Sequence, residues 1–293
     1  YRVGFSSGLS EDPTAVSSEF TAPLSEDAQK QFPEIQNHCR VSGSHEAWTL
    51  YGDKSIKTSD LKYADDSFFK IFSFKITSGN PQTALQNPFS VVLSKTLAGK
   101  IFGKTEPVGK TILVDGKTNY QVTGVTEDAP ANSTIKYEAL ASMSTLYHDS
   151  TYFMGWNGGW QYSHYLQLSD DASATGLEKK FKNFLYDNFN QKFSTPSQSL
   201  AAYLQPMSKI HLYYDESAAN TRTNIYVFSV IALLILIISC INYVNLSVAR
   251  ASSRFKEVGV RKVLGALRIQ LVKQFMGETL LISFISLVLA VGI

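Results

Sequence analysis

The stretch from Gly103 to Thr111 (GKTEPVGKT) ends in Gly-Lys-Thr, as a phosphate-binding loop does. A P-loop has four residues between its first glycine and the Gly-Lys pair, and it joins a strand to a helix whose N-terminus faces the phosphate. Here five residues separate Gly103 from Gly109, and the surrounding pattern predicts a helix before the stretch and a β-hairpin after it. The sequence therefore argues against ATP binding by this chain.

Histidines and paired acids are the other candidates for chemistry. The five histidines have no HxH or HExxH spacing, which favours surface or packing roles over metal ligation. Asp65-Asp66 and Asp170-Asp171 could act as acid and base, but adjacent acids in turns are more typical of solvated caps, and no nucleophile accompanies them. We expect a non-catalytic chain without a catalytic, metal-binding or cofactor-binding residue.

A loop rich in glycine and aromatic residues runs from Gly155 to Trp160 (GWNGGW), with further aromatic residues nearby. Exposed aromatic side chains are common anchors for binding partners. Packing across a boundary between two subdomains explains the same composition, and we favour this second interpretation.

An apolar segment without any charge lies between Arg222 and Arg250 and is 27 residues long. A bilayer core of about 30 Å needs about 20 helical residues, so residues 223–249 are predicted to form a transmembrane helix. The alternative, a buried helix of a soluble protein, is disfavoured because such helices rarely run so long without charge. A second apolar run predicts that residues 274–293 are the start of the next transmembrane helix, cut short here.

The charge distribution predicts the orientation. Residues 250–273 carry seven Lys or Arg against one Glu, an excess typical of loops that stay in the cytoplasm. Residues 1–221 are then extracytoplasmic. The whole chain has net charge +2 and residues 222–293 carry +6, which leaves −4 for residues 1–221. This region has no basic footprint for nucleic acid, and we expect no nucleic-acid partner.

The extracytoplasmic region mixes strand and helix patterns. Its best hairpin signal is Thr111–Val114 and Asn119–Val125 around the turn Asp115-Gly116. A strand at Phe89–Leu93 leads into a helix capped by Ser94, and a later amphipathic helix spans about 175–189 between strands at 165–168 and 201–204. We expect an α+β domain over residues 1–221, with a β-rich subdomain at about 88–160.

The basic segment after the first membrane helix has mixed features. Its apolar residues, among them Phe255, Val258 and Val263, fall near one helix face, with charged residues around them. Gly259 and Gly265 would each weaken an isolated helix by about 1 kcal/mol, which fits a turn or a close approach of backbones. A plain cytoplasmic loop, or a helix lying in anionic lipid headgroups, is the simpler alternative.

Segment 241–268 (INYVNLSVARASSRFKEVGVRKVLGALR) resembles the signature of FtsX-like permeases of the MacB type, close to E-[VI]-G-[VI]-R-[KR]-x-x-G-A. The upstream region is similar to the periplasmic core domain of the same family in five short pieces. These are Tyr63–Phe69, Gly79-Asn80-Pro81, Ser90–Ser94, Phe102-Gly103 with Pro107–Lys110, and Val122–Val125.

The resemblance implies a porter-like α+β subdomain with a β-rich insert, tethered between the first two transmembrane helices of a multi-pass protein in the bacterial inner membrane. Residues 1–221 would lie in the periplasm, and residues 250–273 would be a cytoplasmic coupling segment docked on an ABC ATPase that binds the ATP. The implied coupling residues are Arg254, Lys256, Glu257, Gly259, Val260, Arg261, Lys262, Gly265 and Ala266.

The resemblance further implies a homodimer or pseudo-dimer of permease modules that passes ATP-driven movement to the periplasmic domain, for export or release of a peptide, drug or lipoprotein. Membrane lipid and other envelope proteins are further implied partners. Two alternatives are an extracytoplasmic sensor without an ATPase and an FtsX-like regulator of cell-wall hydrolases. The sensor should continue into a cytoplasmic output domain, whereas this chain enters a second apolar segment.

Overall fold

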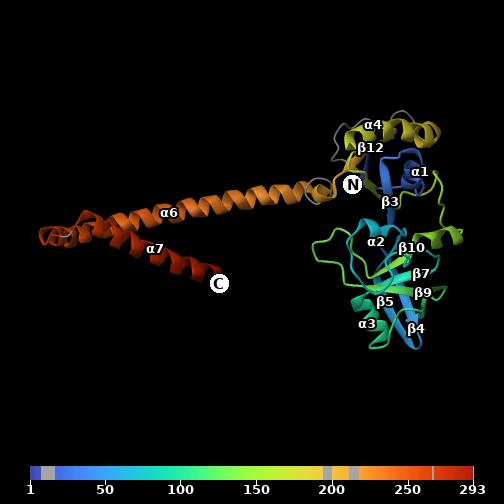
Figure 1. Cartoon of the computed structure of the whole chain (residues 1–293), viewed down its shortest axis with the longest axis horizontal. Coiled ribbons are helices and arrows are strands. Elements are labelled where there is room, and N and C mark those ends of the chain that lie inside the picture. The colour runs from blue at the N-terminus through green and yellow to red at the C-terminus, as the bar shows by residue number, and fades with distance from the viewer. Residues whose placement is uncertain (8–16, 194–199, 211–217, 266, 293) are drawn as a thin grey trace. The chain divides into compact units, whose positions relative to one another are not determined.

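The computed structural model describes residues 1–7, 17–193, 200–210, 218–265 and 267–292 (Figure 1). The chain divides into two compact units, Tyr1–Ala219 and Asn220–Ile293. The first unit contains all twelve strands that the structure describes, and the second contains two long helices. This is the α+β domain followed by membrane-type helices that the sequence predicts.

The first half of unit 1 is an antiparallel sheet covered by helices. Its strands run in the order β3-β11-β1-β12, with β2 paired to β11. Helices α1 and α4 share one core with this sheet, in which Phe5, Phe20 and Phe181 are fully or almost fully buried. The bounds are β1 Arg2–Ser7, β2 Glu19–Phe20, α1 Leu24–Gln31, β3 Ile35–Ser42, β11 Tyr162–Leu168, α4 Ala174–Leu185 and β12 Leu200–Gln205.

The second half is a closed ring of strands inserted between β3 and β11. The ring runs β10-β7-β9-β8-β4-β5 and closes because β5 also pairs with β10. Helix α3 shares the ring's core through Leu97 and Ile101. The bounds are β4 His45–Tyr51, β5 Lys54–Ala64, β6 Ile76–Gly79, β7 Ser90–Ser94, α3 Lys95–Phe102, β8 Thr111–Val114, β9 Thr118–Thr126 and β10 Ala139–Ser142.

The ring starts earlier than the predicted β-rich range of about 88–160. Its first strand begins at His45 and its last strand ends at Ser142. The difference arises because the β4–β5 hairpin completes the ring. Residues 143–161 instead lead back toward the first half.

Local chemistry explains several ring elements. The Ser94 hydroxyl accepts a hydrogen bond from the Leu97 amide and caps α3, as predicted. Asp115 and Gly116 both have positive φ angles, 51° and 65°, which a two-residue hairpin turn requires. Gly79 leaves no room for a side chain, since a Cβ there would lie 2.3 Å from the Thr123 carbonyl oxygen.

A further core lies where the two halves meet. It combines Val41 and Tyr165 from the sheet with Val92 and Leu140 from the ring of strands, packed around the buried side chain of Phe68. Phe68 lies on the single-turn helix α2 (Phe68–Ile71), and its aromatic side chain packs against those of Phe72 and Phe74. These residues, and not the glycine-rich loop, fill the boundary.

The prediction that the loop Gly155–Trp160 packs across the boundary is therefore wrong for its two tryptophans. Trp156 and Trp160 both pack on Phe20, in the core of the first half. The indole nitrogen of Trp156 also donates a hydrogen bond to Asp27 on α1, at 3.0 Å. The physical reason is that the loop leads directly into β11, so its rings reach the core of that sheet.

Unit 2 consists of α6 (Ala218–Val263) and α7 (Arg268–Gly292). Segments Thr223–Ala249 and Ile269–Ala290 are long and apolar enough to cross a membrane. At 1.5 Å per residue, the 46 residues of α6 span about 70 Å, more than a bilayer needs. The predicted coupling segment 250–273 thus comprises the last turns of α6, a short connection and the first turn of α7.

Candidate functional site

The connection between α6 and α7 is a tight turn set by Gly265. The Leu264 amide donates to the Val260 carbonyl at 3.1 Å, and the Gly265 amide donates to the Lys262 carbonyl at 3.2 Å. Gly265 has φ +90°, the left-handed conformation that often ends a helix and that glycine adopts without strain. Of the two explanations that the sequence offers for Gly265, a turn or a close approach of backbones, the structure shows the turn.

Side chains tie the two helices together just beyond this turn. The Arg261 guanidinium donates a hydrogen bond to the Gln274 side-chain oxygen at 2.8 Å. Among the side chains of unit 2 that the structure describes, Leu271 is buried and Val258 is half-buried. The Gln270 side chain accepts a hydrogen bond from the Leu267 amide and so caps the start of α7. The turn therefore sits at the end of a joined helical hairpin.

The tip of this hairpin exposes apolar side chains beside positive charges. Val263 and Leu264 are 88% and 81% exposed, next to the exposed Lys262. Large exposed apolar side chains gathered at one place mark contact surfaces for a partner or a membrane. The hairpin tip, defined here as Gly259–Leu267, is our candidate functional site.

The structure brings most predicted coupling residues to this tip. Gly259, Val260, Lys262 and Gly265 are exposed, whereas Arg261 is half-buried against Gln274. A Cβ added at Gly259 would meet no atom within 4 Å, so its backbone is open to a partner. Arg254, Lys256 and Glu257 belong to α6 but their side chains lie outside the described part of the structure, as does Ala266 entirely.

The Gly-Lys-Thr stretch has the structural context that the sequence predicts. Helix α3 ends at Phe102, just before this stretch, and strand β8 begins at Thr111, the last residue of the stretch. A P-loop needs a helix N-terminus at that point to receive phosphate. Among the residues that the structure describes, no group of three or more His, Cys, Asp or Glu side chains could hold a metal ion.

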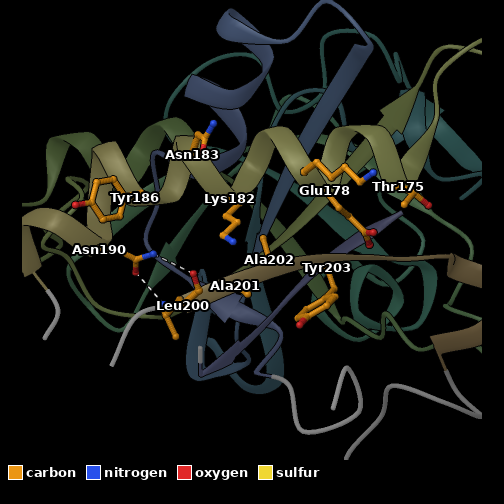
Figure 2. A pocket seen from close by; sticks show the side chains of 11 residues that line it. Thr175, Glu178, Lys182, Asn183, Tyr186, Asn190, Leu200, Ala201, Ala202 and Tyr203 are labelled. Carbon is orange, nitrogen blue, oxygen red and sulfur yellow. Dashed lines mark hydrogen bonds between the residues drawn. The ribbon is translucent and has the colours of Figure 1, made fainter. Parts of the chain in front are cut away.

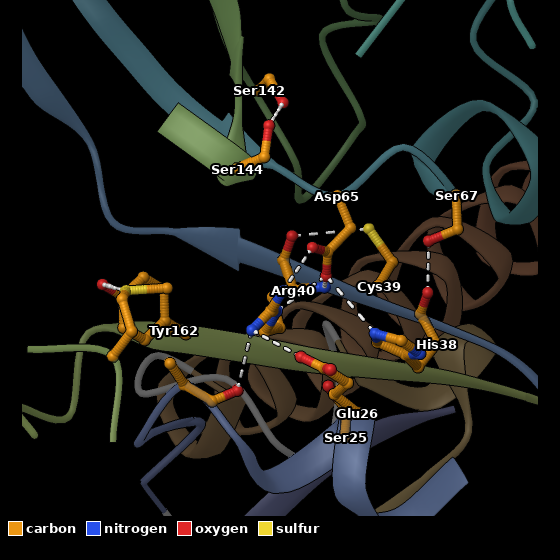
Figure 3. Close-up of polar contacts among 12 residues, drawn as sticks. Ser25, Glu26, His38, Cys39, Arg40, Asp65, Ser67, Ser142, Ser144 and Tyr162 are labelled. Atoms are coloured by element: carbon orange, nitrogen blue, oxygen red, sulfur yellow. Dashed lines mark hydrogen bonds and ion pairs between the residues drawn. The ribbon is translucent and has the colours of Figure 1, made fainter. Parts of the chain in front are cut away.

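A buried ion pair connects the two halves of unit 1 (Figure 3). Arg40 on β3 and Asp65 after β5 form a two-pronged contact, from Nε to Oδ2 at 2.9 Å and from Nη2 to Oδ1 at 2.8 Å. The Arg40 backbone amide also donates to Asp65 Oδ2 at 2.7 Å. Because β3 lies in the sheet and β5 in the ring, this pair holds the two halves in one arrangement.

Two more segments contribute to the surroundings of Arg40. Its Nη1 donates to the Ala22 carbonyl ahead of α1 and to the Tyr147 hydroxyl, which follows β10. Glu26 on α1 lies 3.6 Å from the same nitrogen. Burial disfavours the charged guanidinium, but the charge and hydrogen bonds of Asp65 outweigh this and raise the pKa of Arg40.

The expectation that Asp65 is a solvated cap is wrong. Asp65 is buried and satisfied by Arg40, while its neighbour Asp66 is exposed. The sequence feature that could have revealed this pair is the single arginine in the strand Ile35–Ser42, whose last four residues are all buried. A buried arginine requires a carboxylate or equivalent partner.

Two histidines lie near this pair, one buried and one half-buried. His164 on β11 is fully buried, and its Nδ1 lies 2.9 Å from the Ser25 hydroxyl. Burial, followed by the positive charge of Arg40, lowers the pKa of His164 to about 3. Burial also lowers the pKa of His38, against the opposing charge of Asp65. Both side chains are therefore neutral near pH 7.

Unit 1 has two kinds of hollow. A groove of about 580 Å³ runs between α4 and the edge strand β12 (Figure 2). A separate cleft of about 470 Å³ lies on the ring and is lined by polar groups such as Tyr63, Asp115 and Asp149. The ring cleft thus offers hydrogen-bonding groups more than an apolar wall.

Comparison with known families covers both units. Residues 3–184 match the MacB-like periplasmic core domain, and residues 229–293 match the C-terminal part of FtsX-like permeases. The first match includes the ring, the sheet without β12, and nearly all of α4. The second match includes the hairpin tip and all of α7 that the structure describes.

Relatives at the sequence level are transporter proteins. The macrolide export ATP-binding/permease protein MacB of Aggregatibacter actinomycetemcomitans is 27% identical over 80% of this chain, which covers 35% of that protein. The ABC transporter permease YknZ of Bacillus subtilis, whose function is uncharacterised, is 23% identical over 78% of this chain and 54% of its own length. The chain thus spans between about a third and about a half of these relatives.

A solved structure shares the fold of unit 1. A permease-protein domain from Porphyromonas gingivalis aligns with a TM-score of 0.58 at 19% identity, over 75% of this chain and 94% of that domain. At this level of identity the likeness establishes the fold and nothing more specific.

Proposed function

The chain belongs to the ABC transporter permeases that combine a MacB-like periplasmic core domain with an FtsX-like membrane region, and on this premise we propose that it couples a separate ATPase to movement of its periplasmic domain. It is a membrane protein with a periplasmic segment. We place it in the bacterial inner membrane, as a dimer or pseudo-dimer of permease modules that binds two ATPase subunits.

The hairpin tip Gly259–Leu267 is the observation that carries this proposal. It combines exposed apolar residues, exposed positive charge and an open backbone at Gly259. A protein surface with a groove can receive such a tip, because the apolar side chains become buried and the surrounding charges fix the register. A plain cytoplasmic loop needs neither the exposed apolar residues nor the interhelical contact of Arg261.

Helix α6 supports mechanical coupling. It continues without a break from the membrane span Thr223–Ala249 to the hairpin tip at Val263. A continuous helix carries a displacement along its axis, whereas a flexible linker absorbs it. The span has no charged residue, and ion or proton paths are usually marked by ionisable groups within the membrane. We therefore propose movement of the periplasmic domain in place of ion transport.

ATP hydrolysis belongs, in this proposal, to the partner. The stretch Gly103–Thr111, which ends in Gly-Lys-Thr, leads into strand β8 and not into a helix. The relatives named MacB are ATP-binding/permease proteins, and this chain covers about a third of their length. We propose that the cargo exported or released is a peptide, a drug or a lipoprotein, with membrane lipid and other envelope proteins as further partners.

Co-purification with an ATPase tests the proposal. The full-length permease is co-expressed with candidate ABC ATPase subunits from its source, and both binding and ATP hydrolysis are measured. The variant Glu257→Lys/Arg261→Glu should release the ATPase or uncouple its hydrolysis from the permease. The matched control, Glu46→Lys/Lys57→Glu, exchanges the charges of an exposed ion pair on the ring and should leave both unchanged.

Two results would count against the proposal. If no ATPase binds the wild-type permease, the hairpin tip is a headgroup-binding or signalling element and the sensor hypothesis leads. If the ATPase binds the Glu257→Lys/Arg261→Glu variant with unchanged hydrolysis, the tip is not the coupling site.

A further inference from the structure

Strand β12 ends the sheet of unit 1. Among the strands that the structure describes, it pairs only with β1, and its other edge faces the groove beside α4 (Figure 2). An unpaired edge presents backbone N–H and C=O groups that can accept another strand. Whether this edge is open depends on which residues direct their backbone groups outward.

The pairing with β1 identifies Ala202 as such a residue. Ala202 lies opposite Phe5 in the register of β1 and β12. The Phe5 amide donates to the Ser17 carbonyl at 2.8 Å, on the side of β1 away from β12. Phe5 and Ala202 are therefore a pair without mutual hydrogen bonds, and the N–H and C=O of Ala202 point toward the groove.

Residues two positions away on β12 point the same way and are already capped. The Glu178 carboxylate accepts a hydrogen bond from the Leu204 amide at 2.8 Å. The Asn190 side chain accepts from the Leu200 amide at 2.8 Å and donates to the Leu200 carbonyl at 3.0 Å. These side chains imitate a neighbouring strand at both ends, while Ala202 between them has no such cap among the described residues.

The wall opposite β12 is one face of α4. Lys179, Lys182 and Tyr186 lie three or four residues apart and line the groove together. Within the part of the chain that the structure describes, neither lysine has an acidic partner at ion-pair distance, whereas the adjacent Lys180 pairs with Glu34 away from the groove. The groove thus combines an uncapped backbone position with two lysines that form no ion pair among the described residues. Its one acidic lining residue, Glu178, is held by the Leu204 amide.

We propose that this groove binds an extended segment of a partner protein, which adds a strand to β12 and places an acidic side chain against Lys179 and Lys182. Backbone groups of the segment would pair with the N–H and C=O of Ala202, a buried residue whose backbone groups have no partner among the described residues. The lysines would select segments that carry a carboxylate. This site lies in unit 1 and is independent of ATPase coupling.

A peptide selection tests both features. A displayed library of random dodecapeptides is selected on the full permease in lipid nanodiscs and counter-selected on Lys179→Glu/Lys182→Glu. We expect enriched peptides with an acidic residue, β-branched neighbours and no central proline. The consensus peptide is then measured by fluorescence anisotropy. Binding should weaken about tenfold for Lys179→Glu/Lys182→Glu, and not for the matched control Lys180→Glu on the same helix.

A modified peptide tests the strand pairing without changing the protein. Methylation of a central backbone nitrogen removes one hydrogen-bond donor and should also weaken binding about tenfold. Equal binding of the methylated peptide, equal binding to the Lys179→Glu/Lys182→Glu variant, or no enrichment of acidic peptides would overturn the proposal. The variant Tyr203→Cys tests whether a second copy of the chain occupies the edge of β12. If two such chains form a disulfide that acidic peptides do not block, a second copy pairs there and the proposal is overturned.

The same samples separate this proposal from the proposed function. The variant Glu257→Lys/Arg261→Glu should bind the consensus peptide as the wild type does, even where ATPase binding is lost. A wild-type permease that fails to bind acidic peptides but couples to its ATPase would contradict only the groove proposal. A permease that binds the peptides but does not couple to an ATPase would contradict only the proposed function.

Discussion

At the scale of single residues, the Arg40–Asp65 pair is a buried charged contact between the sheet and the ring. Arg40 is 5% exposed and directs its guanidinium to Asp65, Ala22 and Tyr147. A buried pair of this kind adds little stability compared with apolar residues of the same size, but removing one partner leaves an uncompensated charge. Its role is to fix one arrangement of the two halves.

Substitution of Arg40 by Met should therefore destabilise unit 1 strongly. We expect a loss of about 3–5 kcal/mol in the free energy of unfolding, since Asp65 is left buried and unpaired. Urea unfolding of the permease in detergent, followed by tryptophan fluorescence, measures this change. The control Lys57→Met removes an exposed ion pair with Glu46 and should cost less than about 1 kcal/mol. A cost of similar size for both variants would contradict this role of the Arg40–Asp65 pair.

His164 predicts a pH dependence of stability. Its pKa is lowered to about 3 in the folded chain, from 6.5, so between these values the unfolded chain binds a proton that the folded chain does not. Stability should fall as the pH drops through this window, by about 2 kcal/mol at pH 5 for this group alone. Unfolding curves from neutral pH to pH 5 should show a shallower loss for His164→Gln than for the wild type.

The exposed His148 provides the matched control for this experiment. The variant His148→Gln should keep the wild-type slope of stability against pH, because the side chain is exposed in the fold. An unchanged slope for His164→Gln would mean that other groups govern the acid response.

Local residue roles were predictable and distant ones were not. The Ser94 cap and the Asp115-Gly116 turn depend on neighbours within a few residues, and both are found as predicted. The Arg40–Asp65 pair joins residues 25 positions apart, and no rule of residue spacing predicts that the fold brings them together. The interpretation of Asp65 as a solvated cap failed for this reason.

At the scale of elements, some helices and hairpins could be predicted from patterns within one segment, whereas the pairing of distant strands could not. Helix α4 and the β8–β9 hairpin follow from sequence patterns within one segment. Closure of the ring depends on β5 pairing with β10, where Leu61 lies opposite Ala139. Such a long-range pairing leaves no signal in either strand alone, which is why the predicted β-rich range starts after the β4–β5 hairpin.

Gly259 allows the hairpin tip to be tested as an element. Replacement by Leu should favour the helix by about 1 kcal/mol, since Gly is the weaker helix former. If the ATPase approaches the backbone at Gly259, the added side chain should nevertheless reduce co-purification of the ATPase about tenfold. The matched control Gly99→Leu lies on α3, where a Cβ likewise meets no atom within 4 Å, and should leave the ATPase bound. Full retention by Gly259→Leu would exclude a close approach there.

At the scale of the whole molecule, the charge distribution and the fold assign different tasks to the two units. Unit 1 holds the sheet, the ring and the groove beside β12, whereas unit 2 holds the membrane spans and the positively charged hairpin tip. The assignment of sides follows from the basic residues of 250–273 and agrees with the periplasmic core match of residues 3–184. Sequence alone predicted this division because it depends on composition along the chain and not on tertiary contacts.

The proposed coupling requires that α6 remain stiff between the membrane span and the hairpin tip. Insertion of a run of glycines after Ala249, roughly seven residues or two helical turns, should uncouple ATP hydrolysis from the permease while the ATPase stays bound. An alanine insertion of the same length keeps the helix and changes its phase by only about 20°, so it should retain part of the coupling. ATPase rates of the purified complexes compare the two, with ATPase binding as a check on assembly. Equal rates for the glycine and alanine insertions would show that movement does not pass along α6, and the hairpin tip would then serve only to anchor the ATPase.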